Sequence, residues 1–143
     1  MEGPLLRDAL PRHGGHAGRG PAPQFNEEMC RLLGRTREEV AAVDWAEVTH
    51  PDDRAAEWEL HQRIAAGEID GYRVDKRFLR PDGSVVYVSE DLKAERDAEV
   101  RVSRFIAAHA DITERVERLK AITRLRDLYD LLEKVIDRCR DAC

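Results

Sequence analysis

His61 is the side chain in this sequence best suited to binding a ligand. It falls in residues 51–66, where a proline start and apolar residues at helical spacing predict a helix. An imidazole on that helix could ligate a metal-containing cofactor or a small molecule. Trp45 and Tyr72 could line a pocket beside it. Because core aromatics and boundary histidines show the same residue types, we expect no bound cofactor.

Other reactive side chains have simpler interpretations. His50 stands before two carboxylates, Asp52 and Asp53, which could suggest acid–base chemistry, but a helix start accounts for all three. No nucleophile–base set and no glycine-rich phosphate loop after a strand is visible. We therefore expect no catalytic residue and no metal site. The set that could be assembled for a metal is His13, His16, Cys139 and Cys143.

Composition limits the classes of partner. The 143 residues carry a formal net charge of −5, and the acidic excess lies in residues 26–112, which argues against nucleic-acid binding. No apolar run is long enough to span a membrane, and no signal peptide is recognisable. Three cysteines suggest a reducing compartment, so we expect a cytoplasmic protein without disulfides.

The first 24 residues predict a flexible tail, because glycine and proline at this density resist both helix and sheet. Short helices follow. Asn26 and Thr36 are good N-caps, and Glu39 completes a capping box with Thr36. A third short turn is expected at Trp45 and Val48. In the longer helix of residues 51–66, the apolar face is expected at Ala56, Leu60 and Ile64.

Three strands are predicted next. Gly71–Leu79 alternates between two faces, and Arg80-Pro81-Asp82-Gly83 is a turn with proline and glycine at favoured places. Ser84–Glu95 and Val100–Ala110 read as the second and third strands, joined by a turn that lacks glycine. Asp75 and Arg77 of the first strand are expected to pair across the sheet. The fold class is therefore α+β, with an antiparallel sheet of three strands after short helices.

The last strand passes into a long helix through five residues, Asp111-Ile112-Thr113-Glu114-Arg115. Asp111 or Thr113 is expected to cap the helix, and Glu114 suits the positive end of its dipole. We interpret these five residues as a signal relay between a domain at 25–112 and a helix at 113–143. A helix of this length exposes more apolar surface than one small domain can cover, so we expect it to pair with another helix.

The apolar residues of that helix follow the spacing of a coiled coil. Intervals of three and four residues join a seam made of Ile122, Leu125, Tyr129, Leu132 and Ile136. An overlapping seam runs through Leu125, Leu128, Leu132, Val135 and Cys139. The interval from Leu119 to Ile122 breaks the heptad phase. We expect a homodimer through this helix, while the spacing leaves the pairing orientation open.

Several stretches, taken in order, resemble the PAS domain of bacterial sensor kinases and cyclic-dinucleotide enzymes. They are residues 25–34, His50-Pro51-Asp52-Asp53-Arg54, residues 72–78, Pro81-Asp82-Gly83-Ser84 and the five-residue relay. The resemblance covers residues 25–115 and departs at the front, where two strands are normally found and the glycine- and proline-rich tail stands instead. It implies a sheet with short helices on one face and a ligand pocket that is open on one side.

The resemblance implies a non-enzymatic sensory and dimerisation module in bacterial signal transduction, such as a two-component system, with a signalling protein as partner. One alternative is the N-terminal part of a PAS-containing histidine kinase or diguanylate cyclase. Another is a haem- or small-ligand sensor that uses His61, because some PAS domains carry a haem-ligating histidine on this helix. Cys30 lacks the asparagine that precedes the reactive cysteine of flavin-binding PAS domains, so we expect it to be structural.

Overall fold

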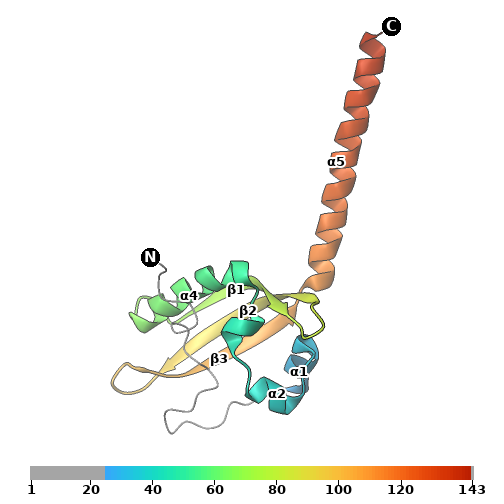
Figure 1. Ribbon diagram of the computed structural model, residues 1–143. Helices are drawn as coiled ribbons and strands as arrows, with labels where there is room; N and C mark the ends of the chain where they lie inside the picture. The colour runs from blue at the N-terminus through green and yellow to red at the C-terminus, as the bar shows by residue number, and fades with distance from the viewer. Residues whose placement is uncertain (1–24, 143) are drawn as a thin grey trace, which may run out of the picture. The chain divides into compact units, whose positions relative to one another are not determined.

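The computed structural model describes residues 25–142 (Figure 1). The predicted flexible tail and its two histidines, like Cys143, lie outside the described residues. The chain divides into two compact units, one ending at Asp111 and one beginning at Ile112, and each is described here by itself.

The described part of the first unit begins with three short helices whose ends are set by local hydrogen bonds. In α1 (Glu27–Leu33) the Asn26 side chain accepts from the Met29 N–H, and Gly34 ends the helix with a left-handed φ of 62°. In α2 (Arg37–Ala41) Thr36 and Glu39 form the predicted capping box. The third helix, α3 (Trp45–Val48), is capped by Asp44. These caps confirm the local predictions.

The fourth helix, α4 (Pro51–Ala65), begins with proline in its first turn and buries an unexpected face. Its buried residues are Glu57, His61 and Ile64, so the predicted face of Ala56, Leu60 and Ile64 is correct only at its last position. Apolar periodicity pointed to the wrong face because two of the inward positions are polar. Their burial requires hydrogen-bonding partners supplied by the sheet.

Within residues 25–142 the sheet has three antiparallel strands in the order β1-β2-β3, as predicted: β1 (Gly71–Leu79), β2 (Val85–Arg96) and β3 (Val102–Asp111). Figure 1 shows the strands side by side, joined by two hairpin connections. Between β1 and β2, Gly83 adopts a φ of 85°, which explains the glycine in that turn. The turn lacking glycine uses Val100 at a φ of 63° instead.

An apolar core fills the space between the short helices and one end of the sheet. Phe78, Val86 and Val88 project from the strands, and Leu33 and Val40 meet them from α1 and α2. Packing of this kind is the main source of stability for a small domain. Here it also fixes the register of β1 against β2, which positions the polar residues further along the same face.

One arginine links the far end of the sheet to the end of α4. The Arg96 guanidinium donates to the carbonyl oxygens of Ile64 at 2.8 Å and Ile69 at 3.3 Å, and to the Asp70 carboxylate at 2.9 Å. It also donates to the carbonyl of Val100 in the turn after β2, at 3.2 Å. The Ile64 carbonyl lies in the last turn of α4 and also accepts from the Gly67 N–H at 3.0 Å, so Arg96 adds a second partner at this helix end.

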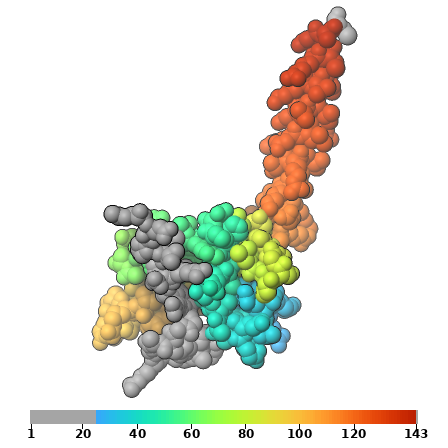
Figure 2. All heavy atoms as spheres, viewed as in Figure 1, coloured from blue at the N-terminus to red at the C-terminus, as the bar shows by residue number. Residues whose placement is uncertain are grey.

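The second unit contains α5 (Thr113–Asp141), a helix with no buried residue. Figure 2 shows one face of this helix. Its N-cap is Ile112, which makes no side-chain cap hydrogen bond, so neither Asp111 nor Thr113 occupies the N-cap position. Glu114 lies in the first turn as predicted and pairs with Arg118 one turn later. Among the described residues, no helix is both long and apolar enough to cross a membrane.

Candidate functional site

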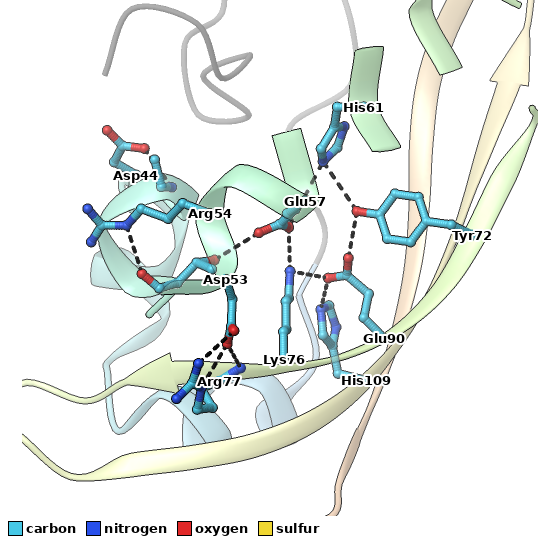
Figure 3. Close-up of polar contacts among 12 residues, drawn as sticks. Asp44, Asp53, Arg54, Glu57, His61, Tyr72, Lys76, Arg77, Glu90 and His109 are labelled. Atoms are coloured by element: carbon cyan, nitrogen blue, oxygen red, sulfur yellow. Dashed lines mark hydrogen bonds and ion pairs between the residues drawn. The ribbon is translucent and has the colours of Figure 1, made fainter. Parts of the chain in front are cut away.

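The inner face of the sheet is apolar at one end and carries polar side chains further along. Beyond the apolar core, each of the three strands places at least one polar side chain on the inner face, toward α4 (Figure 3). We call this set the buried polar cluster: Glu57 and His61 from α4, Tyr72 and Lys76 from β1, Glu90 from β2 and His109 from β3. Four elements therefore meet in one hydrogen-bonded network.

Lys76 is the centre of the cluster. Its Nζ lies 2.5 Å from Glu57 Oε1 and 2.8 Å from Glu90 Oε2, and its side chain is 4% exposed. Glu90 is as deeply buried as Lys76, and Glu57 is only slightly more exposed. A buried ammonium is stable only when carboxylates of this kind offset its loss of hydration. Lys76 therefore ties α4 to the middle strand of the sheet.

Glu90 joins Lys76 to two further members of the cluster. Its carboxylate accepts from the Tyr72 hydroxyl at 2.9 Å and lies 2.6 Å from His109 Nε2, in addition to its bond with Lys76. Burial by itself would raise the pKa of Glu90. The hydrogen bond from His109 and the charge of Lys76 outweigh burial and lower that pKa to about 2. Glu90 is therefore ionised throughout the physiological range.

Tyr72 connects His61 of α4 to Glu90 of β2. Burial, together with the charges of Glu90 and Glu57, raises the pKa of Tyr72 far above its usual range, so it is a neutral donor. Since its hydroxyl hydrogen goes to Glu90, the contact of 3.3 Å with His61 Nε2 places the imidazole N–H on that nitrogen. His61 also meets the ring of Phe105 edge-on, at 5.5 Å between ring centroids.

The structure brings together two of the three candidate ligand-binding residues, and the third packs against another member of the buried polar cluster. His61 and Tyr72 are in contact, while Trp45 stacks on His109, with 6.4 Å between centroids and 6° between planes. Trp45 also packs against Phe25 and Phe78. It lies where the apolar core meets the buried polar cluster. Among residues 25–142 no group of side chains has the arrangement of a metal site.

Sequence reasoning missed Glu57, Lys76, Glu90 and His109 as parts of this site. One signal was present, because the alternation of β1 places Lys76 on the same face as Tyr72 and Phe78. A lysine on an otherwise buried face requires acidic partners. The sequence could not indicate which carboxylates these are, because Glu57 and Glu90 belong to separate elements.

A second ion pair fixes the start of α4 to β1. Arg77 contacts both Asp53 carboxylate oxygens, at 2.9 and 2.8 Å, and the Arg77 backbone N–H donates to the same carboxylate. These bonds lower the pKa of Asp53 despite partial burial. The expected pairing of Arg77 across the sheet is therefore wrong, because its partner comes from a helix.

The predicted relay residues occupy the end of β3 and the start of α5. Asp111 is the last residue of β3 and pairs with Val88, and Thr113 is the first residue of α5. His109 of the buried polar cluster lies on β3 two residues before Asp111. The five seam residues of α5 are 48–68% exposed. Their predicted roles in relay and dimerisation remain predictions.

An antiparallel sheet preceded by short helices and followed directly by a long helix is the arrangement that PAS domains show after their first two strands. The family model for the PAS fold matches residues 23–109, and the chain belongs to this family. The resemblance inferred from separate sequence stretches is thereby confirmed.

A probable diguanylate cyclase, DgcE, of Escherichia coli (strain K12) is 29% identical over 91 residues, which make up 64% of this chain and 8% of that protein. The chain thus spans less than a tenth of that relative.

Solved structures show the same fold. A sensory box histidine kinase/response regulator from Burkholderia thailandensis E264 superposes with a TM-score of 0.56 at 21% identity, covering 70% of this chain and 75% of that one. The N-terminal domain of a diguanylate cyclase with a PAS/PAC sensor from Marinobacter aquaeolei gives 0.53 at 24%, covering 62% and 81%. An RNA-binding light-oxygen-voltage receptor gives 0.55 at 30%, covering 73% and 29%.

Proposed function

We propose that this chain is a non-catalytic sensory and dimerisation module. Its first unit, which we call the PAS unit, passes a change in its interior to α5. The observation that carries the proposal is the form of α5. It is a 29-residue helix that follows β3 after a single residue, has no buried residue, and exposes apolar side chains at coiled-coil spacing. An exposed apolar seam of this kind is stable in water when it pairs with a second helix.

The buried polar cluster is the part of the PAS unit through which we expect a signal to act. It joins α4 to all three strands through charged groups, so altering one hydrogen bond changes the partners of the others. His109 places one end of this network close in sequence to the relay. A ligand or partner that displaces α4 would therefore alter the last residues of β3, and a packed element of this kind transmits discrete shifts.

The relatives favour a role as the input of a larger signalling system, either a histidine kinase or a diguanylate cyclase. DgcE shares 29% identity over the aligned region, so the alternative that this chain represents a segment of such an enzyme follows from a specific similarity. Catalysis would then belong to other domains of that enzyme. Two-component signalling and a cytoplasmic location are parts of the same proposal.

A haem or small-ligand sensor at His61 is the remaining alternative. His61 Nε2 already lies within hydrogen-bond distance of Tyr72, and the side chain is 7% exposed. Binding haem iron through that nitrogen would require His61 to leave the buried polar cluster. An absorption spectrum of haem-supplemented protein tests this alternative, which requires a Soret band that disappears in His61→Ala.

Sedimentation equilibrium tests the dimer. Leu132 lies on the seam, whereas its neighbour Leu131 lies on another face of α5, and both are about half exposed. We expect the wild-type chain to dimerise, Leu132→Lys to be monomeric and Leu131→Lys to keep the dimer. A monomeric wild-type chain, or equal effects of the two lysines, would contradict the proposal.

The relay is tested separately by replacing Asp111 and Thr113 together with alanine in the full chain. We expect the helical content and the dimer affinity of α5 to change, because the two residues flank the N-cap of the helix. Circular dichroism and sedimentation measure both quantities. A double variant that matches the wild type in both would exclude the relay role of these side chains.

A further inference from the structure

The two flanks of the α5 seam differ in chemistry. If Ile122, Tyr129 and Ile136 take heptad position a, then Leu125, Leu132 and Cys139 take position d. One flank, position g, is then apolar and consists of Ala121, Leu128, Val135 and Ala142. The other flank, position e, carries the charged residues Arg126, Glu133 and Arg140. All of these residues are exposed on the isolated helix.

A parallel pair would match these flanks poorly. In a parallel coiled coil, position g of one helix faces position e of the next heptad on the other helix, where charged pairs usually form. That geometry sets Leu128 against Glu133 of the second copy and Val135 against Arg140 of the second copy. Each contact puts an apolar side chain against a charge. The parallel arrangement therefore gains no ion pair at these positions and partly desolvates charged groups.

An antiparallel pair places the two apolar flanks against each other and the two charged flanks against each other. In that orientation position g faces position g, and position e faces position e. Core layers then join Ile122 to Cys139, Leu125 to Ile136 and Tyr129 to Leu132 across the two copies. In the same register, Leu128 meets Val135 of the second copy on the apolar flank. On the charged flank, Arg126 meets Glu133 of the second copy, and the two-fold symmetry repeats this ion pair.

We infer that α5 pairs with α5 of a second copy of this chain in antiparallel orientation, in the register just given. The inference rests on the proposed function, since it specifies the geometry of the proposed dimer. The paired segment covers residues 121–142, or about 33 Å at 1.5 Å per residue. The two helix starts, each carrying a PAS unit, then lie at opposite ends of the pair.

Charge reversal tests the register. Glu133→Arg sets two arginines against each other at two symmetric places, and so does Arg126→Glu with two glutamates. We expect each single change to raise the dimer Kd about tenfold at low salt. The double variant Arg126→Glu/Glu133→Arg restores opposite charges and should return within about threefold of the wild type. Asp130→Lys, on the outer face, is the matched control and should leave the Kd unchanged. A double variant as weak as the singles would overturn the register.

Thiol crosslinking tests the orientation in the full chain with Cys30→Ser and Cys143→Ser. A parallel pair brings Cys139 beside Cys139, so a short bismaleimide would link the copies directly. The antiparallel pair sets Cys139 opposite Ile122, so we expect a crosslink only after Ile122→Cys is added. Peptide mass spectrometry should then identify a 122–139 link. A 139–139 link would overturn the orientation but keep the proposed dimer, whereas a wild-type monomer in sedimentation would overturn both.

Discussion

The PAS unit buries charged side chains, while α5 exposes apolar ones, and the two departures from the usual distribution have different explanations. In the buried polar cluster, Lys76, Glu57 and Glu90 satisfy one another inside a single chain. Along α5, side chains such as Leu125 and Leu132 have no covering partner among the described residues. A buried charge thus indicates an internal network, whereas an exposed apolar seam indicates another molecule.

Removing the Lys76 ammonium from the buried polar cluster is expected to change the free energy of unfolding more than any other substitution considered. Lys76→Met leaves two carboxylates buried without their cation, and we expect the free energy of unfolding to fall by about 3–5 kcal/mol. Urea unfolding followed by tryptophan fluorescence measures this loss, because both tryptophans lie in the PAS unit. Arg73→Met, at an exposed position of the same strand, is the control and should change stability by less than about 0.5 kcal/mol.

A compound variant sharpens this result. Adding Glu57→Gln and Glu90→Gln to Lys76→Met removes the unpaired charges, so part of the lost stability should return. A triple variant less stable than Lys76→Met alone would show that the unpaired carboxylate charges are not the cause of the loss.

The acid side of the stability profile is the second test. The pKa of Glu90 is lowered from 4.5 to about 2 in the folded state, so its carboxylate stabilises the fold above about pH 4.5. This contribution is lost as the pH falls toward 2 and amounts to about 3 kcal/mol. Glu90→Gln should lack that pH-dependent loss, whereas Asp91→Asn, at an exposed neighbouring position, should retain it. Identical acid unfolding of Glu90→Gln and wild type would contradict the assignment.

The ion pair at the start of α4 gives a smaller effect, since it is partly solvated. Asp53→Asn removes the bidentate contact with Arg77, and we expect a loss of about 1–2 kcal/mol in urea unfolding. Asp52→Asn is the adjacent control, because the Asp52 side chain is 75% exposed and lies 4.0 Å from the guanidinium. Equal losses in the two variants would point to an effect of helix-dipole charge rather than of the pair.

The smallest effect on the stability of the PAS unit is expected from a substitution in α5. Tyr129→Ala should leave the unfolding free energy of the PAS unit within about 0.5 kcal/mol of wild type, while weakening the dimer. Tyr129 is 68% exposed and has no part in the core of the first unit. Tryptophan fluorescence at a protein concentration below the dimer Kd isolates the first quantity. A large loss there would show that the PAS unit depends on α5.

Local signals made most of the fold predictable from the sequence. Caps at Asn26 and Thr36, the proline at the start of α4 and the turn at Gly83 each act through residues close in sequence, and the structure confirms them. The α+β class and the three strands followed from these boundaries and from alternation along β1.

The candidate site was less predictable because its contacts are long-range. Lys76 and Glu57 are 19 residues apart, and so are Glu90 and His109. Apolar periodicity favoured Ala56 over Glu57 on α4, since a periodic pattern counts apolar side chains and cannot detect a polar face satisfied by distant partners. The same limit explains the wrong partner predicted for Arg77.

Arg96 has a consequence for how the PAS unit opens. Its guanidinium holds the end of α4, the loop before β1 and the turn before β3 through a single side chain. Opening any one of these segments breaks hydrogen bonds that the same group makes to the others. The three segments therefore form one cooperative unit in amide hydrogen exchange, with a shared opening free energy, although they are separated along the chain.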